Sequence, residues 1–393
     1  MTFSYLIGSR AASRVRGKST TTKAKFLQIG NYPPPACGWA IQTKLLVEEL
    51  RRRGNVCRIL KINEGRKRKS EEYIDVQNGL DYVFKLLRFA ITGHQFQVHV
   101  NGQSKIGFVM ALVAALVGRL SGNPVALSWR GGLQQKYFPR PNGCWVRSAY
   151  RLLFLLSGKI VCNDAQVKQA IESYGIRSDL IASIPGFSRQ YLKFRQIPLA
   201  PEVESFLSNH RPVFFCYVSF RTEYGLESLR DAMWRFRLRH PEAGFIWLGF
   251  PYKEMQLARQ FVDGWPQSER DGLLLLGNLE HNEFLTLLTR CFAYIRTPAC
   301  DGVASSVLES LALGIPVVAS QNYDRPPNVI TYRAGDAVDL IDKLEFVIER
   351  YAQVKAQTYL TSIEDNIERT ADWLLGEPAE HVHQLSEDVA HAS

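Results

Sequence analysis

Residues 296–320 combine two acids with a run of small residues in a pattern that suits phosphate and sugar chemistry. The segment reads RTPACDGVASSVLESLALGIPVVAS, with Asp301 in a loop and Glu309, eight residues later, in the first turn of a helix expected over 306–313. Small residues let main-chain N–H groups approach an anion closely, and the amino end of a helix adds unpaired N–H groups and its positive dipole end. The segment therefore predicts a diphosphate site whose carboxylates accept hydrogen bonds from sugar and ribose hydroxyls.

The same residues are also typical of a helix start that binds nothing. Ser306 and Glu309 form the Ser-x-x-Glu pattern of a capping box, in which the serine bonds a helix amide and the glutamate reaches back. Gly314 and Pro316 are ordinary helix-stop signals. On spacing alone, an anion site and a simple helix cap are equally good interpretations.

Strand-like and helix-like segments alternate along two stretches of the chain. The first stretch runs from KFLQIG at 25–30 through VCRIL, FQVHV and VALSW, with helices expected over 105–120 and 145–156. The alternation pauses in a proline-bearing linker at 195–203 and then continues from PVFFCYV to PVVAS. Such alternation indicates parallel strands joined by helical crossovers. The predicted fold class is therefore α/β, with two doubly wound Rossmann-like domains that face a central cleft.

These patterns divide the chain into four parts. We expect a basic disordered tail at 1–24, for which an organelle transit peptide is the alternative, and an acceptor-side Rossmann-like domain at 25–196. A nucleotide-sugar-binding Rossmann-like domain is expected at 203–345. A helical tail at 346–393 is expected to pack back on the N-terminal domain.

The composition excludes several classes of protein. The chain has 393 residues, 46% of them hydrophobic, which suits two domains. Its seven cysteines include no Cys-x-x-Cys pair, so we expect neither a disulfide framework nor a zinc site. The longest apolar run, 106–120, is shorter than the ~20 residues that span a bilayer. The first 25 residues lack a small-residue cleavage site, so the predicted location is cytoplasmic.

The charge is divided unequally between the two halves. Residues 1–200 contain 31 Lys and Arg against 10 Asp and Glu, a net charge of +21, whereas residues 201–393 have a net charge of −11. The basic runs at 51–54 and 66–69 have no interleaved aromatics that would stack bases, so nucleic acid is not an expected partner. The charge favours attraction to phosphate or to an anionic membrane, with solvated loops as the alternative. The mixed apolar and basic segment 145–156 suggests peripheral contact at the inner membrane face, and a core helix is its alternative.

The segment DGVASSVLESLALGIPVVAS resembles the donor-site motif of the family-4 glycosyltransferases, which are retaining enzymes with the GT-B fold. NYPPPACGWAIQTKLLVEELRRRG is similar to the opening loop and first helix of that family, with Gly38 in the loop that faces the donor diphosphate. VCNDAQVKQAIESYGIRSDLIASIPGF and LLLLGNLEHNEFLTLLTRCFAYIRTP resemble further stretches of the family in the same order. Together the similar stretches cover most of residues 25–330.

The resemblance implies a set of site residues. The implied catalytic residues are Asp301 and Arg130, and the implied donor-binding residues are Gly38, Ser219, Arg221, Gly302, Val303, Ala304, Ser305, Ser306 and Glu309. His99, which ends a strand at the cleft in HVNG, is a third catalytic candidate, with a structural histidine as the alternative. The chain also departs from the family pattern. Ser219 stands where the family usually has Arg, Tyr224 where it has Lys, and Arg130, in SWRGG, where it commonly has His. Arg221 is the expected replacement cation, with a solvated loop arginine as the alternative.

The implied activity is that of a retaining hexosyltransferase. It would move a sugar from a nucleotide-diphosphate-sugar donor to a hydroxyl of a glycan or lipid-linked glycan acceptor, in polysaccharide or cell-envelope biosynthesis. No cofactor is expected, and no metal, because the sequence has no Asp-x-Asp signature for a divalent ion. The alternatives are a nucleotide-sugar epimerase on the same fold and a non-catalytic nucleotide-sugar-binding protein. The sequence leaves open the donor base and sugar, the acceptor, the linkage, the oligomeric state and the effect of Tyr224 on activity.

Overall fold

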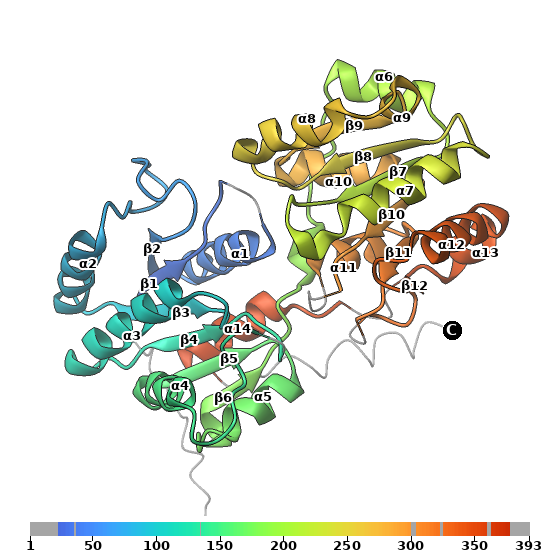
Figure 1. The fold of residues 1–393 in the computed structure, drawn as a ribbon. Coiled ribbons are helices and arrows are strands. Elements are labelled where there is room, and N and C mark those ends of the chain that lie inside the picture. The colour runs from blue at the N-terminus through green and yellow to red at the C-terminus, as the bar shows by residue number, and fades with distance from the viewer. Residues whose placement is uncertain are drawn as a thin grey trace, which may run out of the picture.

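The protein consists of two parallel six-stranded sheets, each with helices on both faces (Figure 1). The structure is a computed structural model that describes residues 23–34, 37–133, 135–299, 304–322, 325–359 and 363–377. The predicted fold class is confirmed, because every pairing within the two sheets is parallel.

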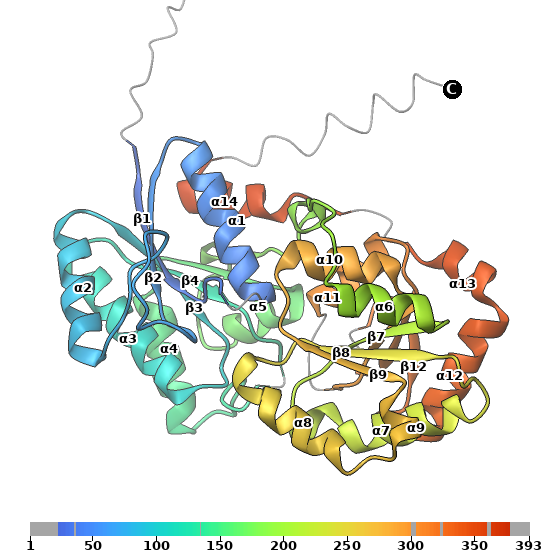
Figure 2. The same cartoon turned by 90° about the horizontal axis from the view of Figure 1, so that it is seen from above.

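The N-terminal sheet has the strand order β2-β1-β3-β4-β5-β6. Its strands are β1 (Lys25–Gly30), β2 (Val56–Lys61), β3 (Gln95–Val100), β4 (Ala126–Trp129), β5 (Lys159–Cys162) and β6 (Ile181–Ser183). Its helices are α1 (Gly38–Arg52), α2 (Gly79–Ile91), α3 (Lys105–Leu120), α4 (Trp145–Leu156) and α5 (Ala165–Glu172). The chain reverses direction across the sheet after β2, and this places α2, α3, α4 and α5 on the face opposite α1 (Figures 1 and 2).

Local sequence signals start three of these helices. The side chains of Asn78, Ser104 and Asp164 each accept a hydrogen bond from the backbone N–H of the residue three positions ahead, at the starts of α2, α3 and α5. Such caps satisfy one of the amides that a helix leaves unpaired at its amino end. The strands between them are almost entirely buried, as parallel strands with helices on both faces must be.

The C-terminal sheet has the order β12-β11-β10-β7-β8-β9. Its strands are β7 (Val213–Tyr217), β8 (Gly244–Leu248), β9 (Leu273–Gly277), β10 (Ala293–Arg296), β11 (Val317–Ser320) and β12 (Ile330–Tyr332). One face packs against α6 (Pro201–Asn209), α10 (His281–Arg290) and α11 (Ser305–Ala312). The other packs against α7 (Leu226–Arg237), α8 (Met255–Asp263) and α12 (Ala337–Glu349), and the short α9 (Gln267–Arg270) precedes β9.

The last helices return the chain to the N-terminal domain. After α13 (Tyr351–Gln357), α14 (Asn366–Leu375) lies beside α1 (Figures 1 and 2). Arg53, just after α1, bonds the carboxylate of Asp372 at 2.5 Å and that of Glu377 at 3.0 Å. The Lys159 ammonium donates to the carbonyls of the last turn of α14 at 2.7 and 3.0 Å. These contacts make α14 part of the N-terminal domain, so the chain passes between the domains twice.

The observed elements differ from the sequence prediction at a few places. The expected helices 105–120 and 145–156 are α3 and α4, but the pattern does not predict α2, β6 or β12. The helix α6 already begins at Pro201, inside the predicted linker and ahead of the predicted domain start at 203. The terminal segments 1–22 and 378–393, which belong to the two predicted tails, lie outside the described residues. Within the described ranges, no helix is both long and apolar enough to cross a membrane.

Candidate active site

The two domains touch where the carboxyl edges of their sheets meet. Gly38 opens α1 beyond β1, and across the interface it faces Ser305, the first residue of α11 beyond β10 (Figure 1). A Cβ atom at Gly38 would lie 2.8 Å from the Ser305 hydroxyl, so the absence of a side chain permits this close approach. The buried Tyr191, in the segment that leaves the N-terminal domain, donates its hydroxyl to the Gly38 carbonyl at 2.7 Å.

The amino end of α11 is not closed by a capping box. The N-cap residue is Ala304, and no described side chain caps the helix. The Ser306 hydroxyl is instead paired with the Tyr294 hydroxyl at 2.7 Å. Glu309 does not reach back to the helix start, because its carboxylate lies 2.8 Å from the His281 ring nitrogen. The capping box that the Ser306–Glu309 spacing suggested is therefore not formed, and no described side chain caps the first amides of α11.

His281 and Tyr191 connect this helix end to the N-terminal domain. His281, the first residue of α10, holds the buried Glu309 carboxylate, and its ring stands edge-on to the Tyr191 ring with centroids 6.4 Å apart. Burial raises the pKa of Tyr191 well above its ordinary value, and the nearby charges of Arg130 and Glu309 act on it in opposite directions. Sequence reasoning missed both residues, because each acts through a partner on another element.

His99, at the end of β3, is a neutral and incompletely bonded imidazole. Its Nδ1 lies 3.3 Å from the Thr43 hydroxyl, which donates its own hydrogen to the Trp39 carbonyl at 2.9 Å. This assigns the imidazole hydrogen to Nδ1 and leaves a lone pair on Nε2, a buried atom with no partner among the described residues. Burial, together with the charge of Arg130, lowers the pKa of His99 to about 3. His99 is therefore a hydrogen-bond acceptor at neutral pH and not an imidazolium acid.

Arg130, just after β4, is a buried cation without a counter-charge in the described part of the chain. The residue is 4% exposed, and none of its three guanidinium nitrogens has a hydrogen-bond acceptor among the described residues. Burial lowers the pKa of Arg130 to about 10, so the group is still charged at neutral pH. A buried charge is normally paired, because removing it from water is unfavourable. Arg130 is thus suited to hold an anionic ligand group.

The loop after β7 differs from the expected arrangement. The Ser219 hydroxyl lies 3.3 Å from the Glu254 carboxylate, and Arg221 is exposed to solvent. Among the described residues, no hydrogen bond or ion pair joins either of them to α11. A different cation lies near Tyr224: the buried Arg296 guanidinium at the end of β10 stands 5.4 Å from the Tyr224 ring centroid and 5.0 Å from that of Tyr217.

The structure therefore brings together only part of the predicted site. Gly38, Ala304, Ser305, Ser306 and Glu309 lie together at the domain interface. His99 and Arg130 share the carboxyl edge of the N-terminal sheet. Ser219 and Arg221 lie on the loop after β7. The remaining predicted residues, Asp301, Gly302 and Val303, lie outside the described residues.

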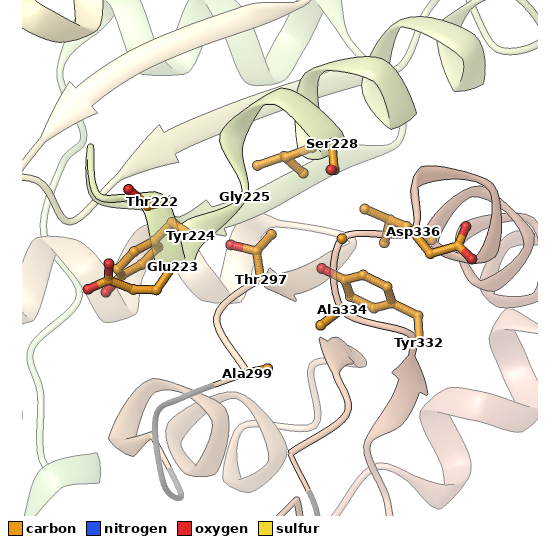
Figure 3. A pocket seen from close by; sticks show the side chains of 13 residues that line it. Thr222, Glu223, Tyr224, Gly225, Ser228, Thr297, Ala299, Tyr332, Ala334 and Asp336 are labelled. Carbon is orange, nitrogen blue, oxygen red and sulfur yellow. The ribbon is translucent and has the colours of Figure 1, made fainter. Parts of the chain in front are cut away.

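A pocket of about 230 Å³, with Tyr224 in its lining, lies in the C-terminal domain between the amino ends of α7 and α12 (Figure 3). Thr297 lines it, with a buried hydroxyl that has no partner among the described residues. This volume is below the ~300–1,000 Å³ of typical ligand sites, and α7 and α12 cover the sheet face opposite α10 and α11. The described ranges also contain no group of three or more His, Cys, Asp or Glu that could hold a metal ion.

Comparison with solved structures identifies proteins of the same architecture. The Anabaena protein HepE in complex with UDP is 14% identical, with a TM-score of 0.61 over 88% of this chain and 94% of that one. A UDP-GlcNAc 2-epimerase from Neisseria meningitidis bound to UDP-GlcNAc is 14% identical, with a TM-score of 0.61 over 90% of this chain and 100% of that one. A UDP-GlcNAc 2-epimerase from Methanocaldococcus jannaschii is 12% identical, with a TM-score of 0.59 over 90% of this chain and 99% of that one.

No protein-family model matches the sequence, and no curated protein matches it. Membership of glycosyltransferase family 4 is therefore a resemblance of motifs that no comparison supports. At identities of this size a structural likeness shows the fold, and function has to be argued from the site. The chain accordingly has the two-domain, Rossmann-like architecture of the GT-B fold.

Proposed function

We propose that the chain is an enzyme that binds a nucleoside diphosphate sugar between its two domains, with the phosphates on the amino end of α11. The observation that carries this proposal is the start of α11, which no described side chain caps and which faces Gly38 of the other domain. A helix start of this kind attracts phosphate through its unpaired amides and its dipole. Proteins of similar fold have been solved with UDP or UDP-GlcNAc bound, which supports a uridine nucleotide as the first ligand to test.

In this proposal Glu309 orients the ribose. Its carboxylate is buried and already holds one hydrogen bond from His281, so its remaining lone pairs suit the two hydroxyls of a ribose. Asp301 would orient the sugar, and the amides of Gly302 and Val303 would extend the phosphate cradle, as the motif resemblance implies. Arg296 would provide the positive charge that Tyr224 lacks, because its guanidinium lies against that ring.

The N-terminal domain contributes two groups of complementary chemistry. Arg130 provides donors and a positive charge for a phosphate or for charge that develops on the leaving diphosphate. His99 provides a lone pair on Nε2 for a hydroxyl of the sugar or of an acceptor. The two groups differ in role, because the arginine only donates hydrogen bonds while the neutral histidine accepts one at this position.

Two reactions fit this binding site. Epimerisation of the nucleotide-bound sugar is favoured by the comparisons, in which several structures of the same fold are UDP-GlcNAc 2-epimerases. Transfer to a glycan or lipid-linked glycan acceptor is favoured by the donor-motif resemblance and by one feature of the chain. Residues 82–163 include β3, β4 and β5 and contain no Asp or Glu, so these strands offer no carboxylate base to remove a proton from the sugar.

Incubation with UDP-GlcNAc alone in deuterated buffer, followed by proton NMR, distinguishes the reactions. An epimerase that removes and returns a proton yields a new sugar with deuterium at the inverted carbon. A transferase leaves the sugar unchanged until a glycan acceptor is added, apart from slow release of UDP. Ligand binding without turnover under either condition would indicate a non-catalytic binding protein. If no uridine or guanosine diphosphate sugar binds, the proposal is contradicted.

The chain offers a matched control for the Glu309 assignment. Glu345 of α12 also pairs with a histidine, His240, at 2.8 Å, but on the opposite face of the C-terminal sheet. We expect Glu309→Gln to weaken donor binding by about ten-fold or more, as loss of a charged hydrogen-bond acceptor does. Glu345→Gln should leave donor binding unchanged. Equal effects of the two substitutions would show that Glu309 acts only through the stability of its domain.

A further inference from the structure

The outer surface of α2, α3 and α4 is unusually apolar for a surface exposed to water. These three helices lie side by side over one face of the N-terminal sheet, away from α1 and α14 (Figures 1 and 2). Eleven of the eighteen large hydrophobic side chains that are exposed in the described ranges lie on them: Leu80, Phe84, Leu87, Ile91, Ile106, Val109, Leu116, Leu120, Trp145, Leu152 and Leu155. We call this surface the helical face.

The exposed side chains form stripes, so they are not isolated surface residues. On α2 they recur at spacings of four, three and four residues from Leu80, which is the period of one helix side. The opposite side of α2 carries Tyr82 and Leu86, which are buried in the core. An ordinary surface helix has one apolar side and one polar side, whereas α2 has two apolar sides. An exposed apolar area of this kind indicates an interaction site.

The helical face is also strongly basic. The helices α2, α3 and α4 together contain six Lys and Arg and a single acid, Asp81. Four exposed bases directly neighbour exposed apolar residues of the stripes: Arg88, Lys105, Arg119 and Arg151. None of these four has an ion-pair partner within 4.0 Å among the described residues.

From these observations we infer that the helical face docks on the anionic surface of a lipid bilayer. Apolar side chains that enter the acyl boundary and bases that meet anionic headgroups are the two contributions that hold amphipathic helices at such a surface. A second copy of the chain is a poor occupant, because two faces of the same positive charge repel each other. The helices α3 and α4 begin at the carboxyl edge of the sheet, where His99 and Arg130 lie, so docking would hold the domain interface close to the membrane.

Co-sedimentation of the full chain with vesicles tests this inference. Wild-type protein should bind vesicles that contain phosphatidylglycerol and phosphatidylcholine, bind vesicles of phosphatidylcholine alone weakly, and release from the former as salt rises. Phe84→Gln with Ile91→Gln should lower the bound fraction at least about five-fold, since both side chains are largely exposed and belong to the stripe. The matched control, Leu238→Gln with Val338→Gln, changes two residues of the C-terminal domain that are also more than half exposed, and it should bind as wild type does.

Further variants separate the helical face from other sources of binding. Arg119→Gln with Arg151→Gln should weaken binding to the anionic vesicles and reduce its salt dependence, because fewer cations then meet the surface. Deletion of residues 1–22, which are basic, should leave most of the binding intact. Circular dichroism of each variant checks that it is folded.

Several results would overturn the inference. Binding by the Phe84→Gln, Ile91→Gln variant equal to that of wild type would do so, as would loss of binding on deletion of residues 1–22 alone. Sedimentation equilibrium without lipid tests whether the chain forms a dimer. A dimer that forms without lipid and that the same double substitution disrupts would assign the helical face to a second copy of the chain.

Discussion

Replacement of Arg130 by methionine should stabilise the ligand-free protein and at the same time remove a ligand contact. Burial lowers the pKa of Arg130 to about 10, and no acceptor among the described residues compensates its charge. The lowered pKa corresponds to roughly 3 kcal/mol against the charged form. Methionine fills much of the same volume without the charge. After some loss of packing, we expect Arg130→Met to raise the free energy of unfolding by ~2 kcal/mol.

Differential scanning calorimetry with and without UDP measures both effects. A gain of ~2 kcal/mol should raise the Tm of the N-terminal domain by about 4–8 °C in the absence of ligand. The increase in Tm that saturating UDP produces in the wild type should shrink in the variant, because a ligand stabilises in proportion to its affinity. Arg130→Lys, which keeps a charge without the fork of donors, should gain no stability and bind UDP weakly.

The opposite result would refute the reasoning. A fall of several degrees in the Tm of the ligand-free Arg130→Met protein would show that the guanidinium has structural partners that the geometry does not reveal. An unchanged response to UDP, combined with a raised Tm, would separate Arg130 from the ligand and leave it a buried charge without a binding role.

Three further substitutions test neighbouring groups. The folded chain keeps His99 neutral down to about pH 3, whereas the unfolded chain takes up a proton on this histidine below pH 6.5. Through His99, the free energy of unfolding should therefore fall by about 2 kcal/mol as the pH falls from 6.5 to about 5. Urea titrations across that range should show a smaller loss for His99→Asn, and an equal loss would contradict the assignment. Gly38→Ala should weaken UDP binding about five-fold in calorimetric titration, because its Cβ would meet the Ser305 hydroxyl at 2.8 Å. Adding Ser305→Gly to this variant should restore the affinity for UDP. Tyr191→Phe should cost about 1 kcal/mol in urea unfolding through loss of the bond to the Gly38 carbonyl, and an unchanged midpoint would exclude that bond.

The architecture could be predicted from the sequence because the strands of parallel α/β domains are buried apolar runs separated by helices. The expected helices 105–120 and 145–156 coincide with α3 and α4 for this reason. The helix α2 escapes the same reasoning, since Phe84 and Ile91 on its outer side are as apolar as Leu86 on its inner side. The edge strands β6 and β12 have only three residues each, which is too short for a period to show.

The candidate site was predictable only where its residues are neighbours in the chain. The motif around Glu309 indicates an anion site, but whether Ser306 caps its helix depends on Tyr294, and whether Glu309 reaches back depends on His281. Both partners come from other elements, so spacing could not decide between the two interpretations. Tyr191 bonds the Gly38 carbonyl within its own domain and contacts His281 of the other domain through its ring, and no sequence pattern marks either contact.

The central claim is that a nucleoside diphosphate binds at the amino end of α11 between the two domains. Isothermal titration calorimetry of the wild-type protein with UDP, UMP and uridine tests it most directly, because the three ligands differ only in phosphate. We expect UDP to bind at least ten-fold tighter than UMP, a difference of about 1.4 kcal/mol, and uridine to bind weakest. Equal affinities for UDP and UMP, or no binding of UDP, would contradict the claim.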